Sequence, residues 1–131
     1  MSTKKDNFSL KDKKYMQIAI NLAKAKKGLT GENPSVGCLI VKNDEIISIG
    51  QTGLNGRPHA ETNAINNSFQ NLSGSKMYVT LEPCNHYGKT PPCTKKIIKS
   101  GIKEVIYSMN DIDKKVKGKS FNILSLSLIH I

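Results

Sequence analysis

Three potential metal ligands, His59, Cys84 and Cys93, constrain this chain of 131 residues more than any other feature. One imidazole and two thiolates satisfy zinc and leave its fourth coordination position to water, which is the composition of a catalytic site. Glu61 stands two residues after the histidine, where a carboxylate can move protons for that water. The fold must therefore bring two distant segments of the chain to one point.

Each of these residues also has an ordinary structural explanation. His59 alone is a loop histidine, Glu61 is a favourable first-turn glutamate, and two cysteines separated by eight residues can be idle buried thiols. Only their combination favours a zinc site, with prolines ahead of both cysteines stiffening the loop. One alternative stays open: His86 as a fourth protein ligand would make the zinc structural, and Glu61 would then have no task.

The composition indicates one soluble domain in a reducing compartment. Three cysteines are an odd number and suit a disulfide framework poorly, and Cys38 lies in an apolar run as a small core residue. No segment is long and apolar enough for a bilayer, and the lysine-rich start is not followed by an apolar signal core. We therefore expect a cytoplasmic protein with no membrane partner.

The formal net charge of +10 could attract nucleic acid or a phosphorylated small molecule. The lysines are scattered from end to end, however, and aromatic residues that could stack on bases are scarce, with no tryptophan. We therefore expect no nucleic-acid partner.

Helical and extended patterns alternate along the chain. We expect helices over Leu10–Lys27, His59–Phe69 and Thr94–Ser100. We expect strands over Val36–Val41, Glu45–Gly50, Met77–Leu81 and Val105–Met109, the first of them buried on both faces. This order predicts an α/β fold in which helices cover a mixed sheet.

The zinc deaminases share a His-x-Glu motif and a pair of cysteines. The segment His59-Ala60-Glu61, together with Thr80–Cys93 and the stretch Asn33–Cys38, resembles the deaminase domain of the bifunctional riboflavin-biosynthesis deaminase/reductase, a member of the cytidine-deaminase-like superfamily. The long loop between Cys84 and Cys93 is the most specific part of the likeness. Cytidine, deoxycytidylate and tRNA-adenosine deaminases mostly keep a two-residue spacing, so the loop argues against them.

The resemblance implies a cytidine-deaminase-like three-layer α/β/α sandwich with a mixed central sheet. It implies Zn²⁺ held by His59, Cys84 and Cys93, with Glu61 as the proton shuttle. The implied reaction converts 2,5-diamino-6-ribosylamino-4(3H)-pyrimidinone 5′-phosphate to 5-amino-6-(5-phosphoribosylamino)uracil and ammonia.

Five further positions are implied to touch the substrate: Asn33, Thr52, His86, Lys89 and Asp111. Asn33 would bind the pyrimidine, and the others would lie near the ribose phosphate, where the Lys89 ammonium suits a phosphate. Thr52 stands where many relatives carry histidine, which weakens its contact. Taken singly, each has an alternative explanation as a turn residue or a solvated loop residue.

Relatives continue into another helix and strand and then a reductase domain, whereas this chain stops at Ile131. We therefore expect a polar N-terminal tail over 1–9, a zinc-dependent deaminase domain over 10–118 and an atypical end over 119–131. The C-terminal strand of the sheet is either missing or supplied by Leu126–Ile131. Reduction would need a separate reductase, and an exposed sheet edge favours a homo-oligomer.

Three other functions remain open at this stage. One is a deaminase acting on a nucleoside, a nucleotide or a tRNA base, which the loop spacing disfavours. Another is a zinc-stabilised nucleic-acid-binding module with His86 as fourth ligand. The last is a truncated domain without activity.

Overall fold

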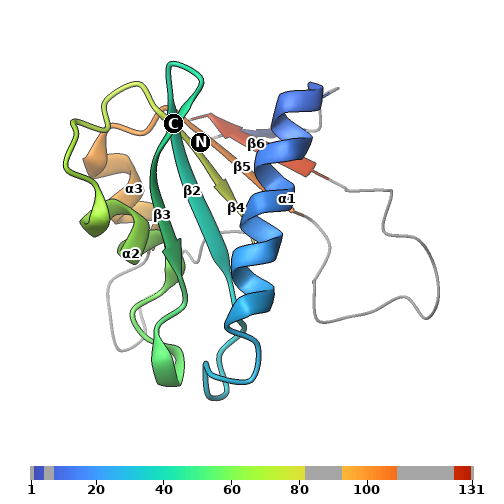
Figure 1. The fold of residues 1–131 in the computed structure, drawn as a ribbon. Coiled ribbons are helices and arrows are strands. Elements are labelled where there is room, and N and C mark those ends of the chain that lie inside the picture. Colours follow the sequence, from blue (N-terminus) through green and yellow to red (C-terminus); the bar gives the residue numbers. More distant parts are fainter. Residues whose placement is uncertain (1, 5–7, 82–92, 109–125, 131) are drawn as a thin grey trace.

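The computed structural model describes residues 2–4, 8–81, 93–108 and 126–130 (Figure 1). The helices are α1 (Leu10–Ala25), α2 (Ala60–Asn67) and α3 (Cys93–Ser100), with a short 3₁₀ helix η1 at Leu54–Gly56. The strands are β1 (Ser2–Lys4), β2 (Gly37–Lys42), β3 (Glu45–Gln51), β4 (Lys76–Val79), β5 (Glu104–Ser108) and β6 (Leu126–His130). The helices and strands expected from hydrophobic periodicity are confirmed, with ends that differ by about two residues.

One mixed sheet of six strands runs through the molecule in the order β1-β6-β5-β4-β2-β3. Strands β4 and β5 are parallel, and the other neighbouring pairs are antiparallel. Strand β2 is buried on both faces, as its continuous apolar run predicts.

The two ends of the chain differ from expectation. Leu126–His130 pairs with β5, so the last strand is present and the alternative in which this segment supplies it is correct. Ser2–Lys4, expected in a polar tail, pairs with β6 as an edge strand. Its polar composition hides it from a hydrophobicity pattern, because an edge strand needs backbone hydrogen bonds more than apolar side chains.

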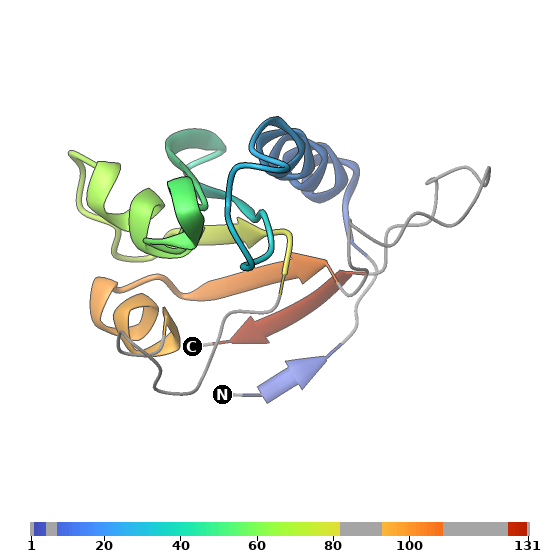
Figure 2. The ribbon, with the colours of Figure 1, turned by 90° about the horizontal axis from the view of Figure 1, so that it is seen from below.

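Helix α1 covers one face of the sheet, and α2 and α3 cover the other (Figure 2). Alternate residues of β2, β4, β5 and β6 belong to the two layers, so that Cys38 and Ile40 of β2 pack toward α2 while Leu39 and Val41 pack toward α1. The predicted three-layer arrangement is confirmed. In the described ranges, no helix has both the length and the apolarity that crossing a membrane requires.

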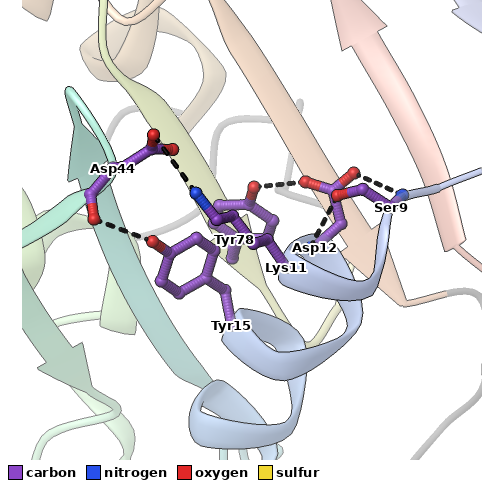
Figure 3. Close-up of polar contacts among 6 residues, drawn as sticks. All are labelled: Ser9, Lys11, Asp12, Tyr15, Asp44 and Tyr78. Atoms are coloured by element: carbon purple, nitrogen blue, oxygen red, sulfur yellow. Dashed lines mark hydrogen bonds and ion pairs between the residues drawn. The ribbon is translucent and has the colours of Figure 1, made fainter.

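One part-buried hydrogen bond and several exposed polar contacts hold the first turns of α1 on the sheet (Figure 3). Ser9 and Asp12 form a reciprocal capping box, and the carboxylate of Asp12 also accepts a hydrogen bond from the Tyr78 hydroxyl of β4. The Tyr15 ring lies 5.1 Å from the Tyr78 ring, and its hydroxyl donates to the Asp44 carbonyl. One tyrosine thus joins the helix start to the centre of the sheet.

We expect Tyr78→Phe to lower the free energy of unfolding by about 1–2 kcal/mol, because Asp12 loses a charge-assisted hydrogen bond. Urea denaturation measures this loss. Tyr15→Phe is the matched control, and we expect it to cost less because its hydroxyl bond lies at the surface.

The same tyrosine should make stability depend on pH. Burial, and secondarily the bond to Asp12, raise the pKa of Tyr78 well above its usual range. Above about pH 10 the unfolded chain loses this proton while the folded protein keeps it, so wild-type stability falls as pH rises. The stability difference between wild type and Tyr78→Phe should therefore shrink above about pH 10, and a constant difference would contradict this.

Two glycines let helices lie directly on strands. A Cβ at Gly37 of β2 would lie 1.9 Å from the Ala19 carbonyl oxygen of α1, and a Cβ at Gly50 of β3 would lie 2.3 Å from the Ala60 carbonyl oxygen of α2. In both cases the obstacle is backbone, which cannot rotate away as a flexible side chain can. The backbone of α2 therefore lies directly against the backbone near the end of β3.

We expect Gly50→Ala to lower the free energy of unfolding by about 3 kcal/mol or more, because α2 must move away from the sheet. Gly74→Ala is a matched control, since its φ of +78° is unfavourable for alanine but no atom lies within 4 Å of the new methyl group. We expect it to cost about 1–2 kcal/mol from backbone strain alone. Denaturation midpoints for both variants decide between steric and conformational causes, and equal losses would contradict the steric one.

Candidate metal and active site

His59 and Glu61 lie at the start of α2, as the sequence predicts. His59 is the N-cap residue and Glu61 is in the first turn, where unpaired backbone N–H groups and the helix dipole favour negative charge. The preceding loop is closed by a hydrogen bond from the Gly53 N–H to the Pro58 carbonyl. This closure fixes the direction from which the chain enters the helix.

Cys93 begins α3, also as expected, and its side chain is buried. Its Sγ lies 3.3 Å from Nδ1 of His59, although the two residues are far apart in the sequence. Two such atoms bound to one tetrahedral zinc would be about 3.5 Å apart, given usual Zn–S and Zn–N bond lengths. The pair therefore fits a shared ion in both chemistry and spacing.

The third expected ligand, Cys84, lies outside the described residues. Among those the structure does describe, no group of three or more His, Cys, Asp and Glu side chains could hold a metal ion. His86, Lys89 and Asp111, expected near the substrate, also lie outside the described ranges. Their roles stay predictions.

Glu61 is a buried carboxylate, with 5% of its surface exposed. Burial raises its pKa to about 7, and a hydrogen bond with its own backbone only partly opposes this. A group with such a pKa exchanges protons readily near neutral pH, as a general acid–base catalyst must.

Cys38 of β2 is a second buried cysteine close to this site. Burial raises its pKa well above the usual value, and the nearby Glu61 and Cys93 raise it further. A thiol held neutral in this way is a poor metal ligand, because zinc binds the thiolate. The prediction that Cys38 is a core residue is confirmed.

Asn33 and Thr52, both expected to contact the substrate, lie in two neighbouring loops. The Asn33 side-chain nitrogen donates to the Gly56 carbonyl at 2.9 Å, and the Asn33 carbonyl accepts from the Thr30 hydroxyl at 2.7 Å. Thr52 is only 2% exposed, and its hydroxyl is bonded to the backbone of Pro34 and Val36. This placement favours a structural role for Thr52 over a phosphate contact.

Asn33 also lines a cavity of about 380 Å³ beyond the end of α1. The other lining residues are Lys27, Gly28, Thr30, Gly31, Glu32, Pro34 and Ser35.

Asn63 is a residue of this region that the sequence patterns did not identify. Its side-chain nitrogen donates to the Gln51 carbonyl at 2.7 Å and to the Pro58 carbonyl at 3.4 Å, which ties α2 to both ends of the preceding loop. Asn63 follows His59 by four residues, so the two share one side of the helix. That spacing is the signal that could have identified it.

A histidine that meets a cysteine, with a buried glutamate two residues after the histidine, matches the zinc-ligand and proton-transfer residues of the zinc-dependent deaminases. The family model described as cytidine and deoxycytidylate deaminase zinc-binding region matches residues 9–109, and the chain belongs to this family. The resemblance drawn from the motifs, the predicted fold and the zinc-dependent deaminase class are thereby confirmed.

Two individual relatives are similar to this chain over most of its length. A diaminohydroxyphosphoribosylamino-pyrimidine deaminase of Buchnera aphidicola subsp. Schizaphis graminum is 51% identical over 110 residues, which are 84% of this chain and 75% of the relative. The riboflavin biosynthesis protein RibD of Aquifex aeolicus is 46% identical over 108 residues, which are 82% of this chain but 30% of that protein.

A solved structure is also similar. The crystal structure of a diaminohydroxyphosphoribosylaminopyrimidine deaminase/5-amino-6-(5-phosphoribosylamino)uracil reductase from Thermotoga maritima matches with a TM-score of 0.69 and 41% identity. The match covers 80% of this chain and 32% of the other. The chain thus spans about a third of the Aquifex and Thermotoga relatives and three quarters of the Buchnera deaminase.

Proposed function

We propose that this chain deaminates 2,5-diamino-6-ribosylamino-4(3H)-pyrimidinone 5′-phosphate by zinc-dependent hydrolysis, in riboflavin biosynthesis. The products are 5-amino-6-(5-phosphoribosylamino)uracil and ammonia. The observation that carries the proposal is the 3.3 Å approach of His59 to Cys93, with the buried Glu61 two residues from the histidine. The substrate is supported by the names of the relatives and by the eight-residue interval between Cys84 and Cys93.

In this proposal, His59, Cys84 and Cys93 hold the ion. Bound zinc supplies a Lewis acid that makes water nucleophilic near neutral pH. Glu61 accepts a proton from that water and passes it to the ring nitrogen beside the amino-bearing carbon. The water oxygen bonds to that carbon and forms a hydroxyl group. Glu61 then takes the proton of this hydroxyl group and delivers it to the amino nitrogen, so that the carbon–nitrogen bond breaks, the carbonyl forms and ammonia leaves.

Asn33 is proposed to hold the pyrimidine on the strength of the resemblance. The cavity that Asn33 lines contains neither His59, Glu61 nor Cys93 in its wall, so it does not bear on this role. His86, Lys89 and Asp111 are proposed to contact the ribose phosphate on the strength of the resemblance. Thr52 is not retained as a contact, since its hydroxyl is buried and bonded to the backbone.

A second candidate is deamination of a cytidine-type nucleoside or nucleotide, favoured by the description of the matching family, which covers cytidine and deoxycytidylate deaminases. A zinc-stabilised binding module is less favoured, because it gives the buried Glu61 carboxyl group no purpose.

Ammonia release from the diaminopyrimidinone phosphate, with cytidine and deoxycytidylate as parallel substrates, tests the proposal. We expect turnover of the first compound and at least about a hundredfold lower kcat/KM for the others. Activity on cytidine or deoxycytidylate without activity on the pyrimidinone would replace the proposed substrate.

We further propose a cytoplasmic homo-oligomer whose product is reduced by a separate enzyme. A separate reductase is supported by the two Buchnera relatives, which are named as deaminases alone. Association is supported by β3, an edge strand whose Ile46 and Ile49 are 42% and 46% exposed. A reducing compartment would keep Cys93 available as a thiolate.

A further inference from the structure

We propose that Thr52 is a positioning residue, which fixes the loop that carries Asn33 and so sets substrate affinity without touching the substrate. The inference rests on the proposed function for the role of Asn33 in binding. The hydrogen bonds on which it is built are independent of that function.

Thr52 follows the last residue of β3 and makes three hydrogen bonds to one short segment. Its hydroxyl accepts from the Val36 N–H at 2.9 Å and donates to the Pro34 carbonyl at 3.2 Å. Its own N–H donates to the Val36 carbonyl at 3.0 Å. The side chain is 2% exposed, so water cannot easily replace these bonds.

The loop that follows Thr52 also binds Asn33 directly. The Gly56 carbonyl accepts from Nδ2 of Asn33 at 2.9 Å, and the Asn55 N–H donates to the Leu29 carbonyl at 3.0 Å. A Cβ at Gly56 would lie 2.5 Å from Asn33 Nδ2, so the residue must be glycine for the two loops to meet. Thr52 holds the backbone next to Asn33, and Gly56 of the same loop holds the Asn33 side chain. Together they fix the direction of the Asn33 side-chain amide.

That loop also leads into the catalytic helix. Asn63 of α2 holds the Gln51 and Pro58 carbonyls, which lie at its two ends. Thr52 consequently links the segment that is proposed to bind the pyrimidine to the segment that presents His59 and Glu61. A shift of this loop would therefore weaken the hold of Asn33 on the ring.

The isosteric variant Thr52→Val removes the hydroxyl and keeps the side-chain volume. We expect it to raise KM for the diaminopyrimidinone phosphate about tenfold, which is the effect of losing one well-placed buried hydrogen bond. Because Asn33 would bind substrate and transition state alike, kcat should stay within about twofold. Thr52→Ser keeps the hydroxyl, so it should retain a KM within about twofold of the wild type.

Two measurements on the protein without substrate test the geometry itself. In Thr52→Val the Val36 amide proton should exchange at least about tenfold faster, since it loses its acceptor. The NMR signal of the Asn33 side-chain amide should also shift, and Thr52→Ser should show neither change. If Thr52→Val does not fold, Thr52→Ala serves in its place.

An unchanged KM together with an unmoved Asn33 signal would overturn the inference, as would a kcat that falls as much as KM rises. If the wild-type protein releases no ammonia from the pyrimidinone, the proposed function fails. The exchange and NMR measurements would then still decide whether Thr52 positions Asn33.

Discussion

Replacing Glu61 with glutamine is expected to lower kcat about a thousandfold while the protein keeps its zinc. Glutamine has the same shape, but it cannot accept a proton from water and return it to the ring and the leaving nitrogen. Burial raises the pKa of Glu61 to about 7, so the wild-type carboxyl group exchanges protons at neutral pH. Its replacement should therefore lower kcat. Steady-state ammonia release and atomic absorption on the same preparation measure the two quantities.

Glu45→Gln provides the matched control for this substitution, because Glu45 is an exposed glutamate at the start of β3. We expect it to leave both kcat and zinc content unchanged. A loss of zinc in Glu61→Gln would mean that Glu61 is a ligand, and a fall of less than about tenfold in kcat would remove it from proton transfer.

Cys93→Ser should weaken zinc binding by at least about a hundredfold and bring ammonia release below detection. A serine hydroxyl stays protonated at neutral pH, so it supplies neither the negative charge nor the soft donor atom that zinc prefers. Competition against a chromogenic chelator measures the affinity. The 3.3 Å distance between Cys93 and His59 makes this the sharpest test of a shared ion.

Cys38→Ala is the corresponding control, because Cys38 is also a buried cysteine and lies near Glu61. We expect it to keep full zinc stoichiometry and to lose only a little stability through the lost sulfur contacts. The proposed ligand set would be wrong if Cys38→Ala lost zinc while Cys93→Ser kept it.

The sequence predicted the sheet with its covering helices and the zinc-deaminase class. It predicted less well which distant segments of the chain pair with each other. Helix α1 and strand β2 were predictable because burial imposes periodicities that can be counted along the chain. Placing His59 and Cys93 at helix starts followed equally from local signals, namely the residues before each helix and its apolar spacing. Strand β1 was missed because its partner, β6, lies at the other end of the chain.

The hydrogen bonds of Thr52 could not be predicted from residue patterns along the chain. Its hydroxyl meets the backbone of Pro34 and Val36 only after β2 and β3 have paired in their particular register. The contacts of Asn63 depend in the same way on how α2 lies against the end of β3. These hydrogen bonds follow from how the elements pack, and hydrophobic spacing along the chain does not show which polar groups will meet.

The meeting of α2 and α3 at His59 and Cys93 has a mechanical consequence. A zinc ion bound to both side chains would act as a removable cross-link between α2 and α3. These two helices would otherwise be joined here only by the chain that runs between them. At a free concentration about a thousand times the dissociation constant, such a ligand adds about 4 kcal/mol to the folded state. Cellular zinc supply would then govern how long the protein survives as well as how fast it works.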